Sequence, residues 1–318
     1  MRPILFIHIG HSKTGTTTIQ RSLQIHADLL RKHGLLLADG QLEFPLDGPV
    51  KHHPLGPIQK MLGSLPASTA DLTAMLDRLR ATLQAHGLRG AVISSENLSA
   101  PEGAVLFAGA REVFEIKVLH LVRRQDDWLE SAWKQWGLKL GQDIETFVDE
   151  QLARGMPDYT GTARAWREMA DSFTMLPMQA VPDLTTTVWN WLGLGHVAPP
   201  APPWENSTYD RSVLEVLVRN PWLFADHEDN TVFESLDVLC PANVPRDGHG
   251  LLNHALASRV MEHYREENAR LQREYFPEAP GLADGTRREA ATAPATEDVL
   301  FRFLGIQTQM LTTVSGRL

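Results

Sequence analysis

Strand-like and helix-like patterns of apolar residues follow one another at the start of the chain. Residues 3–9 form a short apolar run that ends at Gly10, which is typical of a buried strand. After Gly15 the apolar positions recur with helical spacing, and Gly34 is a typical residue at a helix end. We therefore predict a strand over 3–9, and then a helix that begins near Gly15 and ends near His33.

The same order of strand and helix recurs through the first 180 residues. Further strands are predicted at 35–38, 91–94, 115–122 and 172–178. Helices are predicted at 71–86, at 102–113, and from Asp126 or Asp127 to about Leu140. The segment 40–68, rich in Gly, Pro and His, is expected to be a loop around a short helix. The repeated order predicts a three-layer α/β/α fold with a central, mostly parallel sheet.

The second half of the chain has a different character. Its predicted helices cover 183–194, 209–219, 251–275 and 297–313, with proline-rich breaks at 199–203 and 277–280. Residues 279–295 consist of Ala, Gly, Pro, Thr and charged residues, as flexible linkers do. We predict an α/β domain over 1–278 that includes helical additions from about 183, a linker over 279–295, and a C-terminal helix over 296–318.

Composition and charge narrow the classes of function. The chain has 318 residues and a formal net charge of -9, which argues against a nucleic-acid partner. Its one cysteine, Cys240, excludes an internal disulfide. The apolar run 3–9 is too short for the core of a signal peptide, and no stretch approaches the length of a membrane span. We therefore predict a cytoplasmic protein without an integral membrane segment; nothing in the sequence indicates an oligomeric state.

The turn between the first strand and the first helix has the composition of an anion site. Gly15 lets the backbone approach a ligand closely, and the helix that follows directs its N-terminal amides at the same point. Lys13 adds a mobile cation, and the threonines add hydroxyl donors. The residues expected to contact a bound anion are Ser12, Lys13, Thr14, Gly15, Thr16 and Thr17.

The order of these residues separates the turn from a Walker A loop. In a Walker A loop a lysine follows the second glycine, whereas here Thr16 occupies that place and Lys13 precedes Gly15. The order Lys-Thr-Gly-Thr-Thr resembles instead the 5′-phosphosulfate loop of sulfotransferases that use PAPS (3′-phosphoadenosine 5′-phosphosulfate). Ser12 stands where that family usually has proline. The resemblance implies a P-loop NTPase-like fold and PAPS as donor substrate.

A second motif of the same family lies at the end of the strand predicted over 115–122. Sulfotransferases hold the donor's 3′-phosphate with an arginine at a strand end and a serine eight positions later. Arg123 and Ser131 have this spacing. On the predicted helix, Ser131 points away from the apolar stripe that includes Trp128, Leu129 and Leu140. The resemblance therefore implies that Arg123 and Ser131 bind the 3′-phosphate.

The resemblance also implies the chemistry. A sulfuryl group would pass in line from PAPS to a hydroxyl or amine acceptor, a carbohydrate or a small metabolite, while Lys13 neutralises the leaving oxygen. Glu96, which follows the strand at 91–94, is the first candidate for the base. His53, with its neighbour His52, is the second candidate. No metal is required, and the sequence contains no convincing cluster of metal ligands.

The chain departs from the sulfotransferase pattern at two points, and two alternative functions remain. The chain has Thr18 where cytosolic sulfotransferases have a tryptophan that stacks on adenine, and it lacks their glycine-rich C-terminal donor segment. A P-loop small-molecule kinase would need a lysine directly after Gly15 and an acidic magnesium ligand at a strand end, where this chain has Arg123. A catalytically silent nucleotide-binding protein would retain the donor motifs but tolerate loss of the base.

Overall fold

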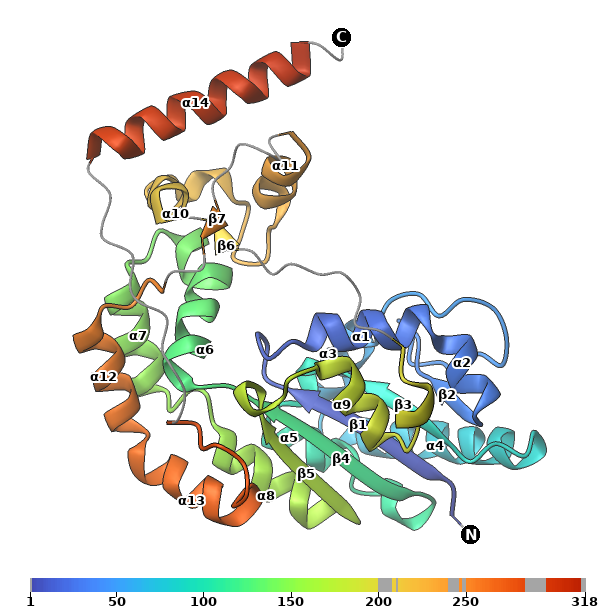
Figure 1. The fold of residues 1–318 in the computed structure, drawn as a ribbon. Coiled ribbons are helices and arrows are strands. Elements are labelled where there is room, and N and C mark those ends of the chain that lie inside the picture. Colours follow the sequence, from blue (N-terminus) through green and yellow to red (C-terminus); the bar gives the residue numbers. More distant parts are fainter. Residues whose placement is uncertain are drawn as a thin grey trace. The chain divides into compact units, whose positions relative to one another are not determined.

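The chain forms two compact units. The computed structural model describes residues 2–199, 208–209, 211–239, 246–247, 250–283 and 296–315. The α/β unit comprises Met1–Arg124, Pro157–Trp204 and Glu266–Asp284. The helical unit comprises Gln125–Met156, Glu205–Arg265 and Gly285–Leu318 (Figure 1). Each unit has its own apolar core and is described separately.

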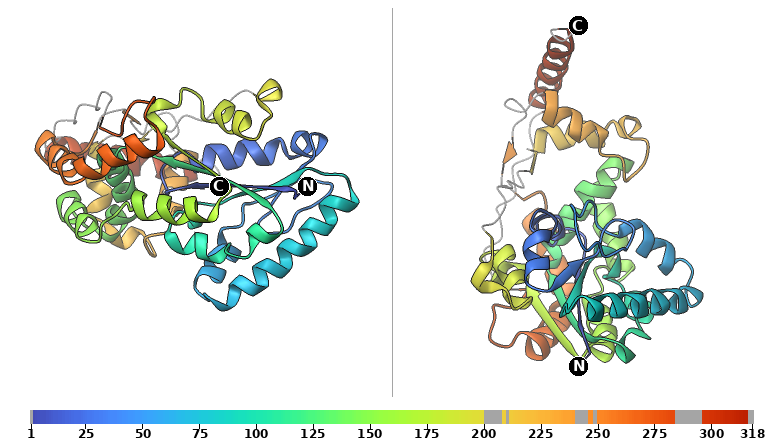
Figure 2. Two further views of the ribbon diagram at one scale, coloured as in Figure 1. Left: turned by 90° about the horizontal axis from the view of Figure 1, so that it is seen from below. Right: turned by 90° about the vertical axis from the view of Figure 1, so that its right-hand side faces the viewer.

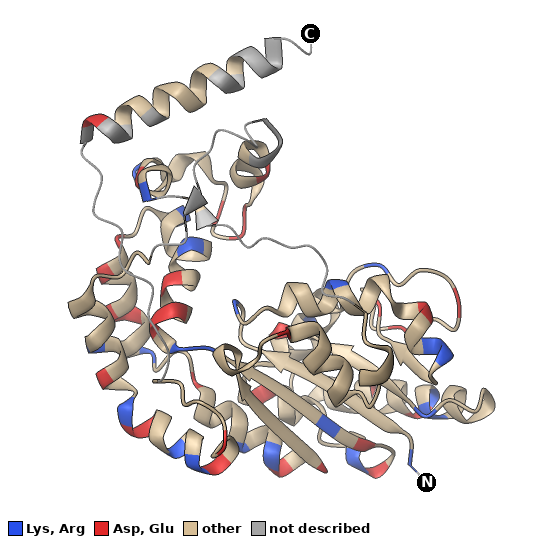
Figure 3. Ribbon diagram, in the orientation of Figure 1, with Lys and Arg blue, Asp and Glu red and all other residues tan. Residues whose placement is uncertain are grey.

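A five-stranded parallel sheet forms the centre of the α/β unit. The order is β2-β3-β1-β4-β5, and every neighbouring pair is parallel. The strands are β1 (Ile4–Gly10), β2 (Leu35–Leu37), β3 (Gly90–Ser94), β4 (Glu115–Val122) and β5 (Ser172–Pro177). All five coincide with the predicted strands to within one or two residues. Most of the sheet is tan in Figure 3, because charged residues lie mainly on helices and loops.

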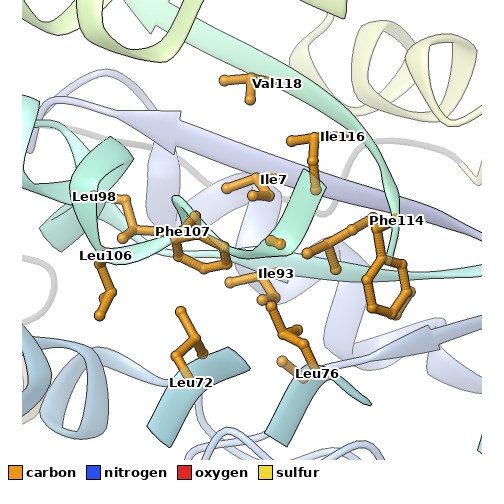
Figure 4. Close-up of a cluster of buried hydrophobic side chains, with 14 of the residues drawn as sticks. Ile7, Leu72, Leu76, Ile93, Leu98, Leu106, Phe107, Phe114, Ile116 and Val118 are labelled. Carbon is orange, nitrogen blue, oxygen red and sulfur yellow. The ribbon is translucent and has the colours of Figure 1, made fainter. Parts of the chain in front are cut away.

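Helices cover both faces of the sheet, as predicted for a three-layer fold (Figure 2). Phe6 and Leu119 share a core with α1 (Thr16–Ile25), α2 (Ala27–Lys32) and α9 (Leu184–Trp191). Ile7, Ile93 and Val118 point to the opposite face (Figure 4). The helices there are α3 (Leu55–Leu62), α4 (Ala67–Ala85), α5 (Pro101–Leu106) and α8 (Tyr159–Met169).

The C-terminal part of the α/β unit packs beside α8. Leu271 of α13 (Arg265–Tyr275) is buried with Tyr159 and with Val122 at the end of β4. Leu282 is fully buried in the same cluster, and Arg124 donates to the carbonyl of Ala283. Residues 279–283, with which the predicted linker begins, therefore lie against the sheet; residues 284–295 of that linker are outside the described part of the chain.

The helical unit is built around tryptophan and leucine side chains. Its helices are α6 (Gln125–Ala132), α7 (Ile144–Ala153), α10 (Arg211–Val218), α11 (Thr231–Leu239), α12 (His254–His263) and α14 (Thr296–Ser315). A two-stranded antiparallel pair, β6 (Thr208–Tyr209) with β7 (Arg246–Asp247), completes it. Within the described ranges, no helix combines the length and apolar composition needed to cross a lipid bilayer.

Several predicted helices differ from the observed ones. The helix predicted from Gly15 to His33 breaks at His26, which keeps Leu23 and Leu30 buried in one core. The helix predicted over 102–113 ends at Leu106, because Gly109 then brings the backbone against Thr73 of α4.

The helix predicted from Asp126 to Leu140 also changes along its length. It becomes a π-helical turn at Trp133–Gly137 and a 3-10 turn at Leu138–Leu140. The helical periodicity is lost there, and Leu140, predicted to lie in the apolar stripe, is 60% exposed. The helices α7, α8 and α11 were not predicted.

Candidate functional site

Three neighbouring strands end at one edge of the sheet, and each is followed by a predicted site segment. The loop 11–15 follows β1, Arg123 follows β4, and Ser95 and Glu96 follow β3. The register aligns Gly10 with Leu121 and His8 with Ser94, and the amide of Ser95 donates to the carbonyl of His8. The chain reverses its direction of winding at β1, where open α/β sheets bind their ligands.

The loop after β1 is a tight turn with two left-handed residues. Lys13 has φ 73° and Gly15 has φ 78°. For a lysine this conformation costs on the order of 1–3 kcal/mol, and such strain concentrates at functional sites. The turn folds back over Gly10, where a Cβ atom would stand only 2.7 Å from the Thr14 hydroxyl oxygen. Gly10 therefore leaves the space that the loop occupies.

The threonines of the loop have different surroundings. Thr14 is fully buried, and its amide and hydroxyl both donate to the carbonyl of His11, at 3.1 and 2.7 Å. Thr16 is buried at the start of α1, whereas Thr17 is exposed. No side chain from the described residues caps α1 at Gly15. The amides of its first turn therefore have the geometry and the dipole of an anion site.

Arg123 connects the second donor motif to the loop. Its guanidinium donates to the carbonyl of Lys13 at 3.2 Å, although the two residues are 110 positions apart in the sequence. This bond places two cationic side chains, Lys13 and Arg123, at one end of the sheet. Each raises the positive potential around the other, and the guanidinium contributes to lowering the pKa of Lys13.

Glu96 lies beside Thr16, the first residue of α1. Its Oε2 accepts a hydrogen bond of 3.0 Å from the Thr16 hydroxyl. Burial is the main cause that lowers the pKa of Lys13, and the Glu96 carboxylate acts in the opposite direction. A partly buried lysine, a carboxylate and a helix N-terminus therefore converge at the loop, as in sites that move protons and bind anions.

His53 lies within electrostatic reach of Glu96. Burial lowers its pKa, the Glu96 carboxylate partly offsets that effect, and His52 adds to it. Asn97, next to Glu96, donates to the carbonyl of Leu55 at 2.9 Å and so ties the segment after β3 to the start of α3. Both predicted bases therefore lie near the loop, and the histidine is neutral at physiological pH.

The remaining predicted donor residues are two serines. Ser131 is half-buried on α6 and outside the apolar cluster that contains Trp128 and Leu129, as the helical spacing predicted. It belongs to the helical unit, so only the spacing of eight relates it to Arg123, and its role stays a prediction. Ser12 is half-buried within the loop itself.

The residues that support the loop were not predicted. Tyr159, the first residue of α8, is fully buried and exchanges two hydrogen bonds with the backbone of Arg123. His11 and His120 pack against its ring. A signal did exist: Asp158 before a helical apolar pattern is typical of a helix start. A crossover helix that leads into a parallel strand begins at the carboxyl edge.

The chemistry available at this edge is anion binding and proton transfer. The loop amides, Lys13 and Arg123 can hold phosphate groups, and Glu96 or His53 can accept a proton. Among the residues that the structure describes, no three His, Cys, Asp or Glu side chains lie close enough together to hold a metal ion.

No protein-family model matches the chain, and no curated protein matches it either. What the site binds must therefore be inferred from its own residues.

Proposed function

We propose that the chain is a PAPS-dependent sulfotransferase. The observation that carries the proposal is the hydrogen bond between the Arg123 guanidinium and the Lys13 carbonyl. It unites the two segments that resemble the donor motifs of that family, one for the 5′-phosphosulfate and one for the 3′-phosphate. A nucleotide phosphorylated at both positions needs two such cationic elements side by side.

The loop would hold the phosphosulfate and stabilise the leaving group. The acceptor oxygen forms a bond to sulfur while the bond from sulfur to the bridging oxygen breaks, and the bonding electrons pass to the 5′-phosphate of PAP (adenosine 3′,5′-bisphosphate). Lys13 and the first amides of α1 face the charge that develops on that phosphate. The strained, partly buried lysine supports this role, because its environment disfavours the charge until an anion arrives.

Glu96 is the better candidate for the base. The acceptor hydroxyl must lose its proton as its oxygen attacks sulfur, and Glu96 would take it. The bond from Thr16 holds the Glu96 carboxylate directly at the loop. His53 also lies near that carboxylate and remains the second candidate. The acceptor would be a hydroxyl-bearing carbohydrate or small metabolite, or an amine.

One observation favours a second function, a P-loop kinase. In P-loop enzymes a hydroxyl at the helix start and an acidic residue on a neighbouring strand hold magnesium. Thr16 and Glu96 form such a hydroxyl–carboxylate pair. Against a kinase, Thr16 occupies the place of the catalytic lysine, and the cation of the loop precedes Gly15.

Calorimetry with two ligands separates the proposals. A sulfotransferase binds PAP without a metal, and the affinity falls at least tenfold in Lys13→Ala and in Arg123→Ala. Lys60→Ala on α3 and Arg78→Ala on α4 remove exposed cations and serve as matched controls. If the chain does not bind PAP but binds ATP with magnesium, it is a kinase or another nucleotide-binding protein, and the proposal is wrong.

The acceptor can be identified with labelled donor. Purified protein is incubated with PAPS that carries sulfur-35, together with pools of oligosaccharides, glycolipids and small alcohols or amines. Transfer that disappears in Lys13→Ala and survives in Lys60→Ala identifies the acceptor class.

A further inference from the structure

Tyr159 makes two hydrogen bonds to one residue. Its hydroxyl accepts from the amide of Arg123 at 3.3 Å and donates to the carbonyl of Arg123 at 2.8 Å. The pairing of β4 with β5 ends one residue earlier, at Val122, so sheet hydrogen bonds no longer hold Arg123. Because buried backbone groups need partners, this phenol fixes the backbone from which the Arg123 side chain extends.

The ring of Tyr159 contacts the other donor motif. It packs edge-on against His11 with ring centroids 4.7 Å apart. The carbonyl of His11 in turn accepts both bonds from Thr14 that close the loop. Burial lowers the pKa of His11 to about 3, so its imidazole stays neutral beside the loop. One fully buried side chain therefore touches the arginine segment and the loop.

We propose that Tyr159 is a positioning residue that sets the separation between the loop and Arg123, and thereby selects nucleotides with phosphates at both the 5′ and the 3′ position. The inference rests on the proposed function. A guanidinium binds a phosphate well only when its fork has the right orientation, and misplacement by even an ångström weakens such a site. The bond from Arg123 to the Lys13 carbonyl completes a closed ring of contacts through both motifs.

The test uses Tyr159→Phe in the full-length chain. The substitution removes the hydroxyl but keeps the ring against His11. Tyr264→Phe is the matched control: this tyrosine is also buried and donates to a backbone carbonyl, that of Met156 in the helical unit. Hydrogen exchange without ligand should be faster over residues 11–16 and around Arg123 in Tyr159→Phe, and unchanged there in Tyr264→Phe. Equal exchange in wild type and Tyr159→Phe overturns the proposal.

The second measurement is the ratio of the affinities for PAP and AMP, which lacks the 3′-phosphate. Tyr159→Phe should weaken PAP about tenfold and AMP less than twofold. In an Arg123→Ala background the same substitution should leave PAP affinity unchanged, since the side chain that it positions is gone. Equal losses for both ligands, or an equal loss in both backgrounds, mean that Tyr159 acts on stability alone and overturn the proposal.

The two measurements separate this inference from the proposed function. If wild type binds no PAP, the sulfotransferase proposal is wrong, and the selection of doubly phosphorylated nucleotides falls with it. The exchange data then still decide whether Tyr159 couples the loop to Arg123. If wild type prefers PAP and Tyr159→Phe keeps that preference, only the role of Tyr159 is wrong.

Discussion

Each unit contains a lysine that is shielded from water, and the two lysines have different surroundings. Lys139 in the helical unit is 2% exposed, donates to the Asn230 side-chain oxygen at 2.8 Å and lies 5.9 Å from the centre of the Phe233 ring. Lys13 in the α/β unit is partly buried in a left-handed turn, and burial lowers its pKa. The first lysine lies in the 3-10 turn Leu138–Leu140 and has an amide partner, whereas the second combines backbone strain with an environment that disfavours its charge.

The difference indicates which cation stabilises the fold and which serves a ligand. Folding gains from Lys139, because its buried ammonium donates to the Asn230 side-chain oxygen. Lys13 lowers the stability of the folded state for two reasons. Its positive φ angle is strained, and its lowered pKa shows that the folded environment disfavours the charged ammonium. A residue retained against such costs is a candidate for function. The comparison leads to four predictions.

The largest effect should come from Glu96, the carboxylate that faces Lys13. Glu96→Gln keeps the bond from the Thr16 hydroxyl but cannot accept a proton. We expect turnover of labelled PAPS to fall by about 10²–10⁴, while PAP affinity stays equal or increases because a negative charge leaves an anion site. A variant that turns over normally would contradict Glu96 as the base, and a loss of turnover in His53→Gln would then assign that role to His53. Absence of turnover in the wild type as well would support the catalytically silent alternative.

Lys13→Ala should have the next largest effect. Loss of the cation at the leaving oxygen should lower turnover by about 10²–10³. The melting temperature should stay within about 1 °C or rise, because the pKa of Lys13 is lowered in the folded state and the charge opposes folding. Differential scanning fluorimetry and the transfer assay measure both on one sample. A clear loss of stability with normal turnover would reverse the comparison of the two lysines.

Much of the α/β unit was predictable because it repeats short local patterns. Short apolar runs marked all five strands, and the order of the elements implied a parallel sheet. That order placed the loop, Glu96 and Arg123 at one edge, since parallel strands share a carboxyl end. The contacts of Thr16 with Glu96 and of Arg123 with Lys13 follow from this placement together with side-chain length.

The rest depends on packing between distant segments. Tyr159 lies on a helix that the apolar pattern did not reveal, and its role depends on the backbone of a residue 36 positions away. The π-helical turn at Trp133–Gly137 changes the helix phase and exposes Leu140, which the 100° period placed in the core. A Cβ at Gly137 would stand 2.7 Å from Trp133 and 2.8 Å from Phe147, so tertiary contacts shape that turn.

The third prediction concerns Lys139. Lys139→Met keeps most of the side-chain volume but removes the charged donor of the bond to the Asn230 side-chain oxygen. We expect a loss of about 1–3 kcal/mol in the free energy of unfolding. Calorimetric binding of PAP should remain as in wild type, in contrast to Lys13→Ala. A variant with wild-type stability but weakened PAP binding would contradict the assignment of Lys139 to fold stability and of Lys13 to ligand binding.

The fourth prediction is a dependence of stability on pH in the α/β unit. Burial lowers the pKa of His8 from 6.5 to about 4 and that of His11 to about 3. Below pH 6.5 these histidines therefore bind protons in the unfolded chain but stay neutral in the folded unit. The free energy of unfolding falls as the pH drops from about 6.5 towards 4 and 3. The loss should be roughly 1 kcal/mol per pH unit for each histidine.

Urea unfolding between pH 7.5 and 5 measures that slope, and hydrogen exchange at both ends of the range separates the units. His8 donates or accepts a bond of 2.8 Å with the Ser94 hydroxyl, so His8→Gln should flatten the slope without ionising. His86→Gln, at the exposed end of α4, should leave it unchanged. As the pH falls, the α/β unit, which contains Lys13, should unfold before the helical unit, which contains Lys139. Simultaneous unfolding of both units, with the same slope in His8→Gln as in wild type, would show that the buried histidines do not cause the loss of stability in acid.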